Sequence, residues 1–383
     1  MGAGAALTVA GATLWTPAVC VESGWVQVEG DRIAAVGVGR PPAGPCVDAA
    51  GLTVCPGFID LHIHGAFGHD VREGEAALVA LGAGLPRFGC TAYLPTTIAA
   101  PWPQTLETVE RLAAALEQAV PGAQALGLHL EGPFFNPLQR GMHLAENLVA
   151  PSAAGARALL DAGRGRVRSI TLAPELPGGL DAVRVLAAAG VLVSIGHSDA
   201  TYAQAQEAFA AGARHVTHCY SAMRGLHHRE PGLLGAAMDL DGLSCEVIAD
   251  GVHVYPAPLR LVWRAKGWRG LALVTDAMPG AGAGDGVYRF GGQDVHVGGG
   301  RAQLAGGALA GSVATMDQLV RTMVEAGVPA RQAVGMATAT PARIGGWPDR
   351  GQVAPGARAD LVALDAELRV AWTMVSGQVV WRR

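Results

Sequence analysis

The sequence predicts an α/β fold: a (β/α)8 TIM-like barrel joined to a small β-sandwich domain that the two chain ends form together. Eight short apolar runs, rich in branched residues, recur between residues 57 and 277, and segments of helical length separate most of them. The whole region predicted for this domain, residues 55–347, is roughly 290 residues long, which suits a barrel that typically takes ~250 residues. Both chain ends instead alternate apolar and polar residues between turn signals, which is typical of half-buried strands.

The two chain ends carry similar strand patterns. LTVAGATLW, WVQVEGDRIAAVG and CVDAAGLTV lie near the start, and ADLVALD, LRVAWTMVSG and QVVWRR lie near the end. Each set is short for a stable domain of its own, so we expect the two sets to pair into one sandwich. This predicts a sandwich domain of residues 1–54 and 348–383 and a barrel domain of residues 55–347.

The barrel strands are expected at the eight apolar runs, which span residues 57–65, 90–96, 125–132, 168–175, 191–197, 214–220, 244–250 and 271–277. Helices are expected at residues 75–88, 103–119, 152–162, 180–189 and 202–211. An open doubly wound sheet is the alternative. However, the first strand is not followed by the glycine-rich phosphate loop that marks such a sheet.

Composition limits the classes of partner and the compartment. The net charge of -4 gives no overall attraction to nucleic acid or anionic membranes. The sequence has no uninterrupted apolar run of the ~20 residues that a membrane span needs, and no basic residues precede its apolar start. Six cysteines without a CxxC pair fit a reducing cytoplasm. We therefore expect a soluble, cytoplasmic protein whose partner is a small molecule.

Histidines and carboxylates follow the apolar runs, where a barrel places its active site. His62 and His64 end the first strand, and their spacing of two puts both imidazoles on one face. The third, fifth, sixth and eighth strands end in Glu131, His197, His218 and Asp276. A lone histidine there is usually structural, but their convergence predicts a site for zinc or for iron, manganese or cobalt. His129, two residues before Glu131, is expected to support this site or to be structural.

Eight motifs occur in one order over nearly the whole chain: GFIDLHIHG, HLEGPF, GHSDA, THCYSAM, REPGLLG, IADGVHV, VTDAM and LAGS. Together they resemble the N-acetylglucosamine-6-phosphate deacetylases of the amidohydrolase superfamily, whereas HxH and TDA alone mark only the superfamily. The resemblance implies a metal-dependent hydrolase of amino-sugar catabolism. It would release acetate from N-acetyl-D-glucosamine 6-phosphate by means of metal-activated water.

The same resemblance implies roles for the strand-end residues. Glu131, His197 and His218 match the ligands of a principal divalent ion. His62 and His64 match positions that help to bind a second ion in the members that retain both, with Glu131 bridging. Asp276 matches the catalytic carboxylate and is counted with the metal ligands. The resemblance thus implies one or two divalent ions per chain, with zinc expected first.

Substrate contacts are also implied by resemblance. His143 matches a residue that contacts the sugar, and Arg229 and His253 match residues that contact the phosphate. Because this family typically supplies the arginine across a dimer interface, the resemblance implies a homodimer. Further candidate substrate contacts are Ser221, Ala222, Leu309, Gly311 and Ser312.

One departure keeps alternatives open. Ser221 stands where the family usually has an asparagine that helps to hold the phosphate. A deacetylase of N-acetylgalactosamine 6-phosphate, or of a related N-acyl amino sugar, is therefore the alternative. A cyclic-amide hydrolase would typically bridge its metals with a carboxylated lysine, whereas the third strand here ends in Glu131. A sugar-binding barrel that has lost catalysis is disfavoured because every metal and acid position is retained.

Overall fold

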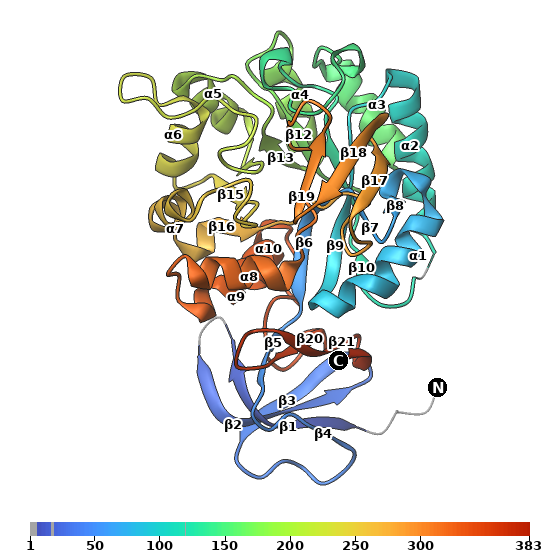
Figure 1. The fold of residues 1–383 in the computed structure, drawn as a ribbon, viewed down its shortest axis with the longest axis vertical. Helices are drawn as coiled ribbons and strands as arrows, with labels where there is room; N and C mark the ends of the chain where they lie inside the picture. Colours follow the sequence, from blue (N-terminus) through green and yellow to red (C-terminus); the bar gives the residue numbers. More distant parts are fainter. Residues whose placement is uncertain (1–5, 17–18, 119) are drawn as a thin grey trace.

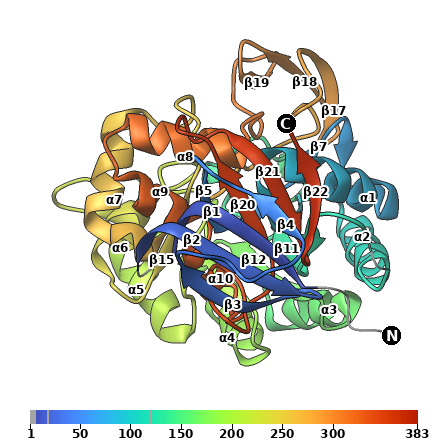
Figure 2. The same ribbon diagram turned by 90° about the horizontal axis from the view of Figure 1, so that it is seen from below.

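Two units make up the molecule, a large barrel and a smaller β unit that lies below it in Figure 1. The structure is a computed structural model that describes residues 6–16, 19–118 and 120–383. Figure 2, the view from below, shows strands from both chain ends lying together across that end of the barrel. The predicted start of the chain at residues 1–5 and the predicted helix end at Ala119 lie outside the described residues.

The β unit is one eight-stranded sheet built from both chain ends. Its strand order is β22-β21-β20-β5-β1-β2-β3, with β4 beside β1. The bounds are β1 (Leu7–Trp15), β2 (Cys20–Glu29), β3 (Arg32–Val38), β4 (Cys46–Asp48), β5 (Thr53–Pro56), β20 (Leu361–Leu364), β21 (Val370–Val375) and β22 (Gln378–Arg382). The chain ends meet where β5 pairs antiparallel with β20, and a separate core includes Val26, Leu361 and Met374. The predicted β unit made from both chain ends is confirmed, and its exact limits stay a prediction.

Eight parallel strands form the barrel, and all eight coincide with the predicted runs. They are β6 (Phe58–Ile63), β9 (Cys90–Thr97), β11 (Leu128–Glu131), β12 (Val167–Leu172), β13 (Leu192–Ile195), β14 (His215–Val216), β15 (Ser244–Val247) and β16 (Leu271–Leu273). Short pieces accompany them: β7 (Gly65–Ala66), β8 (His69–Asp70) and β10 (Gln124–Ala125). Because β5 leads directly into β6, the C-terminal ends of the barrel strands point away from the β unit (Figure 1). The predicted barrel is confirmed.

Helices surround the barrel strands (Figure 1). They are α1 (Glu75–Gly84), α2 (Trp102–Ala115), α3 (Ala153–Gly163), α4 (Gly179–Ala188), α5 (Tyr202–Ala211), α6 (Gly232–Asp239), α7 (Pro256–Gly270), α8 (Met316–Glu325), α9 (Ala330–Ala337) and α10 (Ala339–Ile344). The predicted helix at 75–88 changes to a 3₁₀ turn at Leu85–Phe88, where Pro86 lacks the N–H that an α-helix needs. None of the described helices has the length and apolar character needed to cross a membrane.

A three-stranded antiparallel sheet, which the sequence analysis did not predict, follows the last barrel strand. It comprises β17 (Gly286–Phe290), β18 (Gln293–Gly298) and β19 (Arg301–Leu304). Two Gly-Gly pairs, at residues 291–292 and 299–300, make its turns with positive φ, which glycine adopts without strain. Phe290 and Val295 pack against Ile98, a residue just past the end of β9. This packing places the sheet beside the barrel mouth.

Asp60, a fully buried carboxylate on β6, helps to close the barrel. It accepts hydrogen bonds from the Thr275 hydroxyl at 2.5 Å and from the backbone N–H groups of Thr275 and His62, both at 3.2 Å. Thr275 follows β16, so this one side chain ties the last strand to the first. The adjacent Asp276 N–H donates to the His62 carbonyl at 2.9 Å and continues the seam.

We expect Asp60→Ala to lower the free energy of unfolding by about 2–4 kcal/mol, because it leaves several buried donors without an acceptor. Denaturant unfolding of metal-free protein measures the change. Asp294→Ala removes an exposed ion pair with Arg289 and should cost less than about 1 kcal/mol. Equal stability of the Asp60 variant and the wild type would show that the seam does not depend on this carboxylate.

Candidate metal centre

A cavity of about 330 Å³ opens at the C-terminal ends of the barrel strands. Its polar lining includes Ser221 and His253 and a set of residues from five strand ends and one loop, which are His64, Glu131, His143, His197, His218 and Asp276. The apolar lining includes Ile98, Met142 and Phe290. The cavity therefore offers both polar and apolar groups to a bound molecule.

Glu131 lies at the centre of the polar side. Its Oε1 atom lies 3.1 Å from the Nε2 of His218, 3.2 Å from that of His197 and 3.3 Å from that of His62. Its Oε2 atom lies 3.4 Å from the Nε2 of His64 and 3.3 Å from that of His143. The side chain is only 3% exposed. A buried carboxylate thus stands between two groups of imidazoles.

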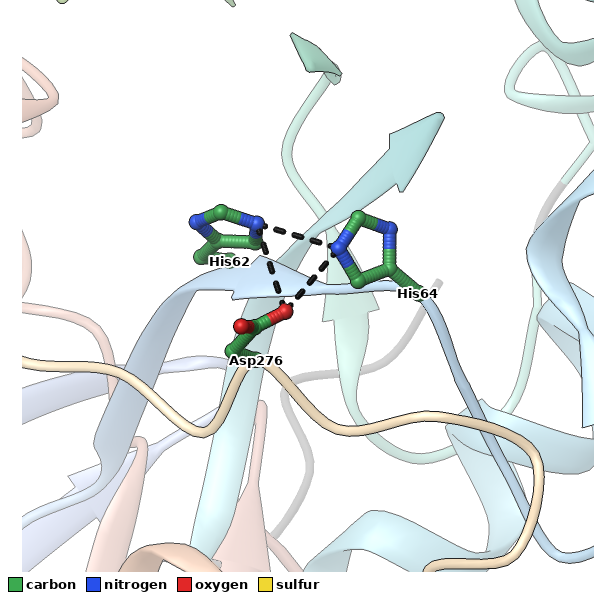
Figure 3. A group of neighbouring side chains, drawn as sticks. All are labelled: His62, His64 and Asp276. Atoms are coloured by element: carbon green, nitrogen blue, oxygen red, sulfur yellow. Dashed lines mark hydrogen bonds and ion pairs between the residues drawn. The ribbon is translucent and has the colours of Figure 1, made fainter. Parts of the chain in front are cut away.

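One of these groups joins the first strand to the last, as Figure 3 shows for His62, His64 and Asp276. The two Nε2 atoms lie 3.1 Å apart, and Asp276 Oδ1 lies 3.0 Å from that of His64 and 3.6 Å from that of His62. Their ligand atoms are close enough together to hold one metal ion. Glu131, His143 and His197 form a second such group.

The hydrogen bonds behind the imidazoles determine which nitrogen faces the site. His64 Nδ1 lies 3.0 Å from the Thr96 carbonyl, and His197 Nδ1 lies 2.9 Å from the Gln139 carbonyl. A carbonyl only accepts, so each ring carries its proton on Nδ1 and turns the lone pair of Nε2 into the site. His62 is set in the same way, because its Nδ1 lies 2.7 Å from Glu246 Oε1.

This arrangement fits a divalent cation. Burial acts to lower the pKa of His62, but the carboxylates of Glu131, Glu246 and Asp276 raise it well above the ordinary value. Without a cation this ring therefore carries a second proton on Nε2, which lies 3.1 Å from the Nε2 of His64. A divalent cation would take the place of that proton. Neutral imidazole Nε2 and carboxylate oxygen are the donor atoms that zinc and similar divalent metals take in proteins. The buried histidine, aspartate and glutamate groups therefore form a divalent metal site.

His143 presents the opposite tautomer. Its Nδ1 accepts a hydrogen bond of 3.4 Å from the backbone N–H of Ala99, so its proton is on Nε2. That Nε2–H points to Glu131 Oε2 at 3.3 Å. Among the imidazoles around Glu131, His143 therefore offers a donor to the cavity.

Both carboxylates at the site are ionised. Burial alone would raise the pKa of Glu131, but the imidazoles of His62 and His197 outweigh burial and hold its pKa well below the ordinary value. Burial likewise acts to raise the pKa of Asp276, and the imidazoles of His62 and His64 lower it. The site therefore carries concentrated negative charge, which a bound cation would offset.

Three site residues have a strained backbone. His197, His218 and Asp276 have φ values of 47°, 25° and 49°, in the left-handed region that ordinary residues avoid. Each follows the end of a barrel strand. The backbone reversal there ends the strand and turns the side chain into the cavity. Such strain persists only where the surrounding structure determines it, which is typical of functional sites.

The barrel interior beneath the site is polar. His129 Nε2 lies 2.8 Å from the Thr171 hydroxyl, and its Nδ1 lies 3.3 Å from that of Thr96. Burial lowers the pKa of His129 to about 3, so the ring is neutral. Its edge lies against His62, with ring centroids 4.6 Å apart. His129 thus supports His62 from below.

Glu246 contacts the site residue His62 but was not predicted from the sequence. It lies in β15 and receives the Nδ1–H of His62, and it is 2% exposed. Burial alone would raise the pKa of Glu246, but the imidazoles of His62 and His215 hold it well below the ordinary value. Its signal in the sequence is a glutamate between the apolar residues Cys245 and Val247 of the run SCEVIAD.

The predicted substrate contacts divide into two sets. Residues on the cavity lining are His143, Ser221, Ala222, His253, Leu309 and Gly311. Ser312 lies behind the lining, where its hydroxyl donates to the Thr275 carbonyl at 2.5 Å and its N–H donates to the Asp276 carbonyl at 2.7 Å. Arg229 lies outside the cavity, in an exposed loop beside His228. The roles of all these residues stay predictions.

Part of the apolar lining was not predicted, namely Ile98, Met142, Phe290 and Ala308. Phe290 comes from β17, and its ring lies 5.4 Å from that of His64 between centroids. Met142 approaches Gly291, and Ala308 stands beside Leu309 on the lining. The Gly-Gly pairs at 291–292 and 299–300 are hairpin signals that could have revealed this wall.

Comparison with known families matches residues 53–380 to the amidohydrolase family. An N-acetylgalactosamine-6-phosphate deacetylase of Escherichia coli O157:H7 is 39% identical over 363 residues, covering 94% of this chain and 96% of the relative. An N-acetylglucosamine-6-phosphate deacetylase of Bacillus subtilis strain 168 is 36% identical over 370 residues, covering 94% and 93%.

Solved structures give the same picture. A mutant N-acetyl-D-glucosamine-6-phosphate deacetylase of Mycobacterium smegmatis, in complex with N-acetyl-D-glucosamine-6-phosphate, superposes with a TM-score of 0.92. It is 38% identical, and the match covers 98% of this chain and 100% of that one. The likeness therefore extends over the barrel and the β unit together.

We expect Glu131→Ala to lose most of the divalent metal that copurifies with the protein, because Glu131 stands between both ligand groups. His62→Ala should lose less, since it changes one group. Elemental analysis gives the metal content per chain. Glu207→Ala, on the exposed face of α5, is the matched control and should keep the wild-type content. Full metal content in the Glu131 variant would contradict the assignment.

Proposed function

The chain belongs to the amidohydrolase family, and we propose that it hydrolyses N-acetyl-D-glucosamine 6-phosphate to D-glucosamine 6-phosphate and acetate. The observation that carries this proposal is the position of Glu131 between two groups of metal-ligand atoms at the barrel mouth. The names of the curated relatives and the substrate bound in the Mycobacterium smegmatis structure support the choice of amino-sugar phosphate.

The ligand groups suggest how metal is held. We assign Glu131, His197 and His218 to a principal ion, because His218 Nε2 lies 3.1 Å from both Glu131 Oε1 and His197 Nε2, whereas His143 turns an N–H toward Glu131. His62 and His64 would hold a second ion, to which Glu131 would also contribute. Zinc is the first expectation for imidazole and carboxylate ligands, and iron, manganese and cobalt take similar sets. One or two ions per chain would then be bound.

Amide hydrolysis at neutral pH requires help for both reactants, because an amide is a poor electrophile and water a poor nucleophile. A divalent cation, when bound, lowers the pKa of a water molecule and polarises the acetyl carbonyl. The water oxygen forms a bond to the acetyl carbon, and the bond from that carbon to the sugar nitrogen breaks. One proton must therefore travel from the water to the departing nitrogen.

Asp276 is placed to carry that proton. It lines the cavity, and its ionised carboxylate can accept a proton at Oδ and release it to the amine. The main chain of Asp276 is fixed on both sides, since its N–H donates to the His62 carbonyl and its carbonyl accepts from the Ser312 N–H. We assign Asp276 as the general base and then the general acid. His143, whose Nε2–H points to Glu131 Oε2 beside the cavity, would contact a substrate oxygen.

The phosphate needs local positive charge, because the whole chain is acidic. His253 lines the cavity, and Asp250 Oδ2 accepts from its Nδ1–H at 2.7 Å. We propose that Arg229 completes the phosphate site from a second copy of the chain in a homodimer. Leu226, three residues before Arg229, is 57% exposed, and Tyr255, two residues after His253, is 74% exposed. Exposed large apolar side chains of this kind support such an interface.

A second substrate is favoured by one observation. Ser221 lines the cavity with a short hydroxyl side chain, and a relative 39% identical to this chain is named an N-acetylgalactosamine-6-phosphate deacetylase. N-acetylgalactosamine 6-phosphate is therefore the second candidate. Acetate release from both epimers, with and without phosphate, decides between them.

We expect Asp276→Asn to lower kcat by at least ~10²–10⁴-fold, because the amide keeps the shape of the side chain but cannot carry the proton. Steady-state assays of acetate release measure the loss. Asp181→Asn changes an exposed aspartate of α4 in the same way and should leave kcat unaltered. Near-normal turnover of the Asp276 variant would refute its role.

We expect Arg229→Ala to lower kcat/KM for the 6-phosphorylated sugar, which corresponds to a loss of ~2–4 kcal/mol of transition-state stabilisation, since a charge-assisted contact is removed. The same variant should hydrolyse unphosphorylated N-acetylglucosamine as the wild type does. Arg289→Ala, on the exposed surface of β17, serves as the matched arginine control. Equal losses on both sugars would place Arg229 elsewhere. A wild type that prefers the unphosphorylated sugar would refute the substrate class.

A further inference from the structure

Glu246 is a buried carboxylate that the proposed reaction does not use. It lies on β15, beneath the residues that line the cavity, and is fully enclosed by protein. Burying a carboxylate is costly unless it is paired and hydrogen-bonded. Its ion-pair partners within the described part of the chain are two imidazoles, those of His62 and His215. The carboxylate therefore has a specific relation to the histidines around it.

One oxygen of Glu246 contacts one residue assigned to each of the two proposed ions, His62 and His218. Glu246 Oε1 accepts from the Nδ1–H of His62 at 2.7 Å, and it also accepts from the backbone N–H of His218 at 3.2 Å. The contact to His62 acts on the imidazole ring, whereas the contact to His218 acts on the main chain. The two contacts therefore have different chemical effects.

The other oxygen is fixed from behind. His215 Nε2 lies 3.2 Å from Glu246 Oε2, and His215 Nδ1 lies 2.7 Å from the Ser244 hydroxyl. Ser244 and Glu246 are two residues apart on β15 and so face the same side of the strand. His215 is the neighbour of Ser244 in the adjacent strand β14. The hydrogen bonds from Ser244 to His215 and from His215 to Glu246 hold the carboxylate in one orientation toward His62.

A carboxylate that accepts the Nδ1–H of an imidazole increases electron density at Nε2, which makes the ring a stronger metal ligand. A ring with the same orientation but a neutral acceptor lacks that effect. In this molecule the ring is His62, whose Nε2 faces His64 and Asp276 (Figure 3). The Nδ1 acceptors of His64 and His197 are neutral backbone carbonyls.

We propose that Glu246 is a positioning residue that strengthens binding of the second metal ion through His62 and holds the His218 main chain at a fixed place beside it. This inference rests on the metal centre of the proposed function. Glu246 lies outside the cavity lining, and its charge and its hydrogen bonds have different effects on the metal centre. The charge of Glu246 strengthens binding of the second ion through His62. Its hydrogen bonds position the ring of His62 and the main chain of His218.

Two substitutions separate these effects. Glu246→Gln keeps an oxygen that can accept from His62 and His218, and its amide can donate to His215, so mainly the charge is lost. Glu246→Ala removes every contact. Glu175→Gln is the matched control. Glu175 is a partly buried glutamate just after β12 that accepts from Ser198 and Asn136 instead of from an imidazole.

The experiment measures metal binding to each full-length protein. Protein stripped of metal is titrated with Zn²⁺ in competition with a chromophoric chelator, and the melting temperature of the stripped protein is recorded. Glu246→Gln should weaken binding of the second ion by about 10–100-fold, with a change of less than about threefold for the first ion. Glu246→Ala should weaken both. Glu175→Gln should bind both ions as the wild type does.

Several outcomes would overturn the inference: a Glu246→Gln protein with wild-type affinity for both ions, one with equal loss of both, or a wild type that binds a single ion. If Glu246→Ala fails to fold, the Gln variant alone decides the matter. A wild type that binds two ions but releases no acetate would refute the proposed function and leave this inference standing. Conversely, a single-ion wild type that deacetylates the sugar phosphate would refute only this inference.

Discussion

A buried negative charge must be surrounded by partners, and in this molecule that charge is Glu131. Five imidazoles lie with Nε2 between 3.1 and 3.4 Å from its oxygens: His62, His64, His143, His197 and His218. They come from the first, fifth and sixth barrel strands and from the loop after the third. The ring of parallel strands brings those ends together at one mouth of the barrel, so the geometry of the site depends on the barrel.

The close approach of these groups requires backbone conformations that cost free energy. Left-handed residues such as His197, His218 and Asp276 each cost on the order of 1–3 kcal/mol. The seam between the last and first strands restrains Asp276, and the Gln139 carbonyl restrains the ring of His197. The rigidity of the scaffold thus serves the site, because a looser barrel would let these residues relax and the ligand atoms separate.

The sequence predicts all eight barrel strands and the residues that end them, because apolar runs and strand-end polarity are local properties. It did not predict Glu246, whose partners His62 and His215 lie on other strands; one carboxylate in an apolar run does not reveal them. The sheet β17–β19 was missed although its Gly-Gly turns are visible. Its strands lie beyond the eighth barrel strand, outside the repeating pattern. The proposed role of Arg229 depends on a second chain, which no local pattern contains.

The pairing of β5 with β20 has a consequence for how the chain folds. The hydroxyl of Thr373 on β21 donates to the carbonyl of Pro86, 287 residues earlier, and similar long-range contacts join the β unit throughout. High contact order of this kind slows folding, because a long loop must close before its contacts repay the lost entropy. During synthesis one edge of β5 stays unpaired until β20 emerges from the ribosome, because the other partners of this part of the sheet, β1 to β4, lie at the start of the chain. That interval is when a chaperone would benefit this protein most, since open edges of this type recruit other chains.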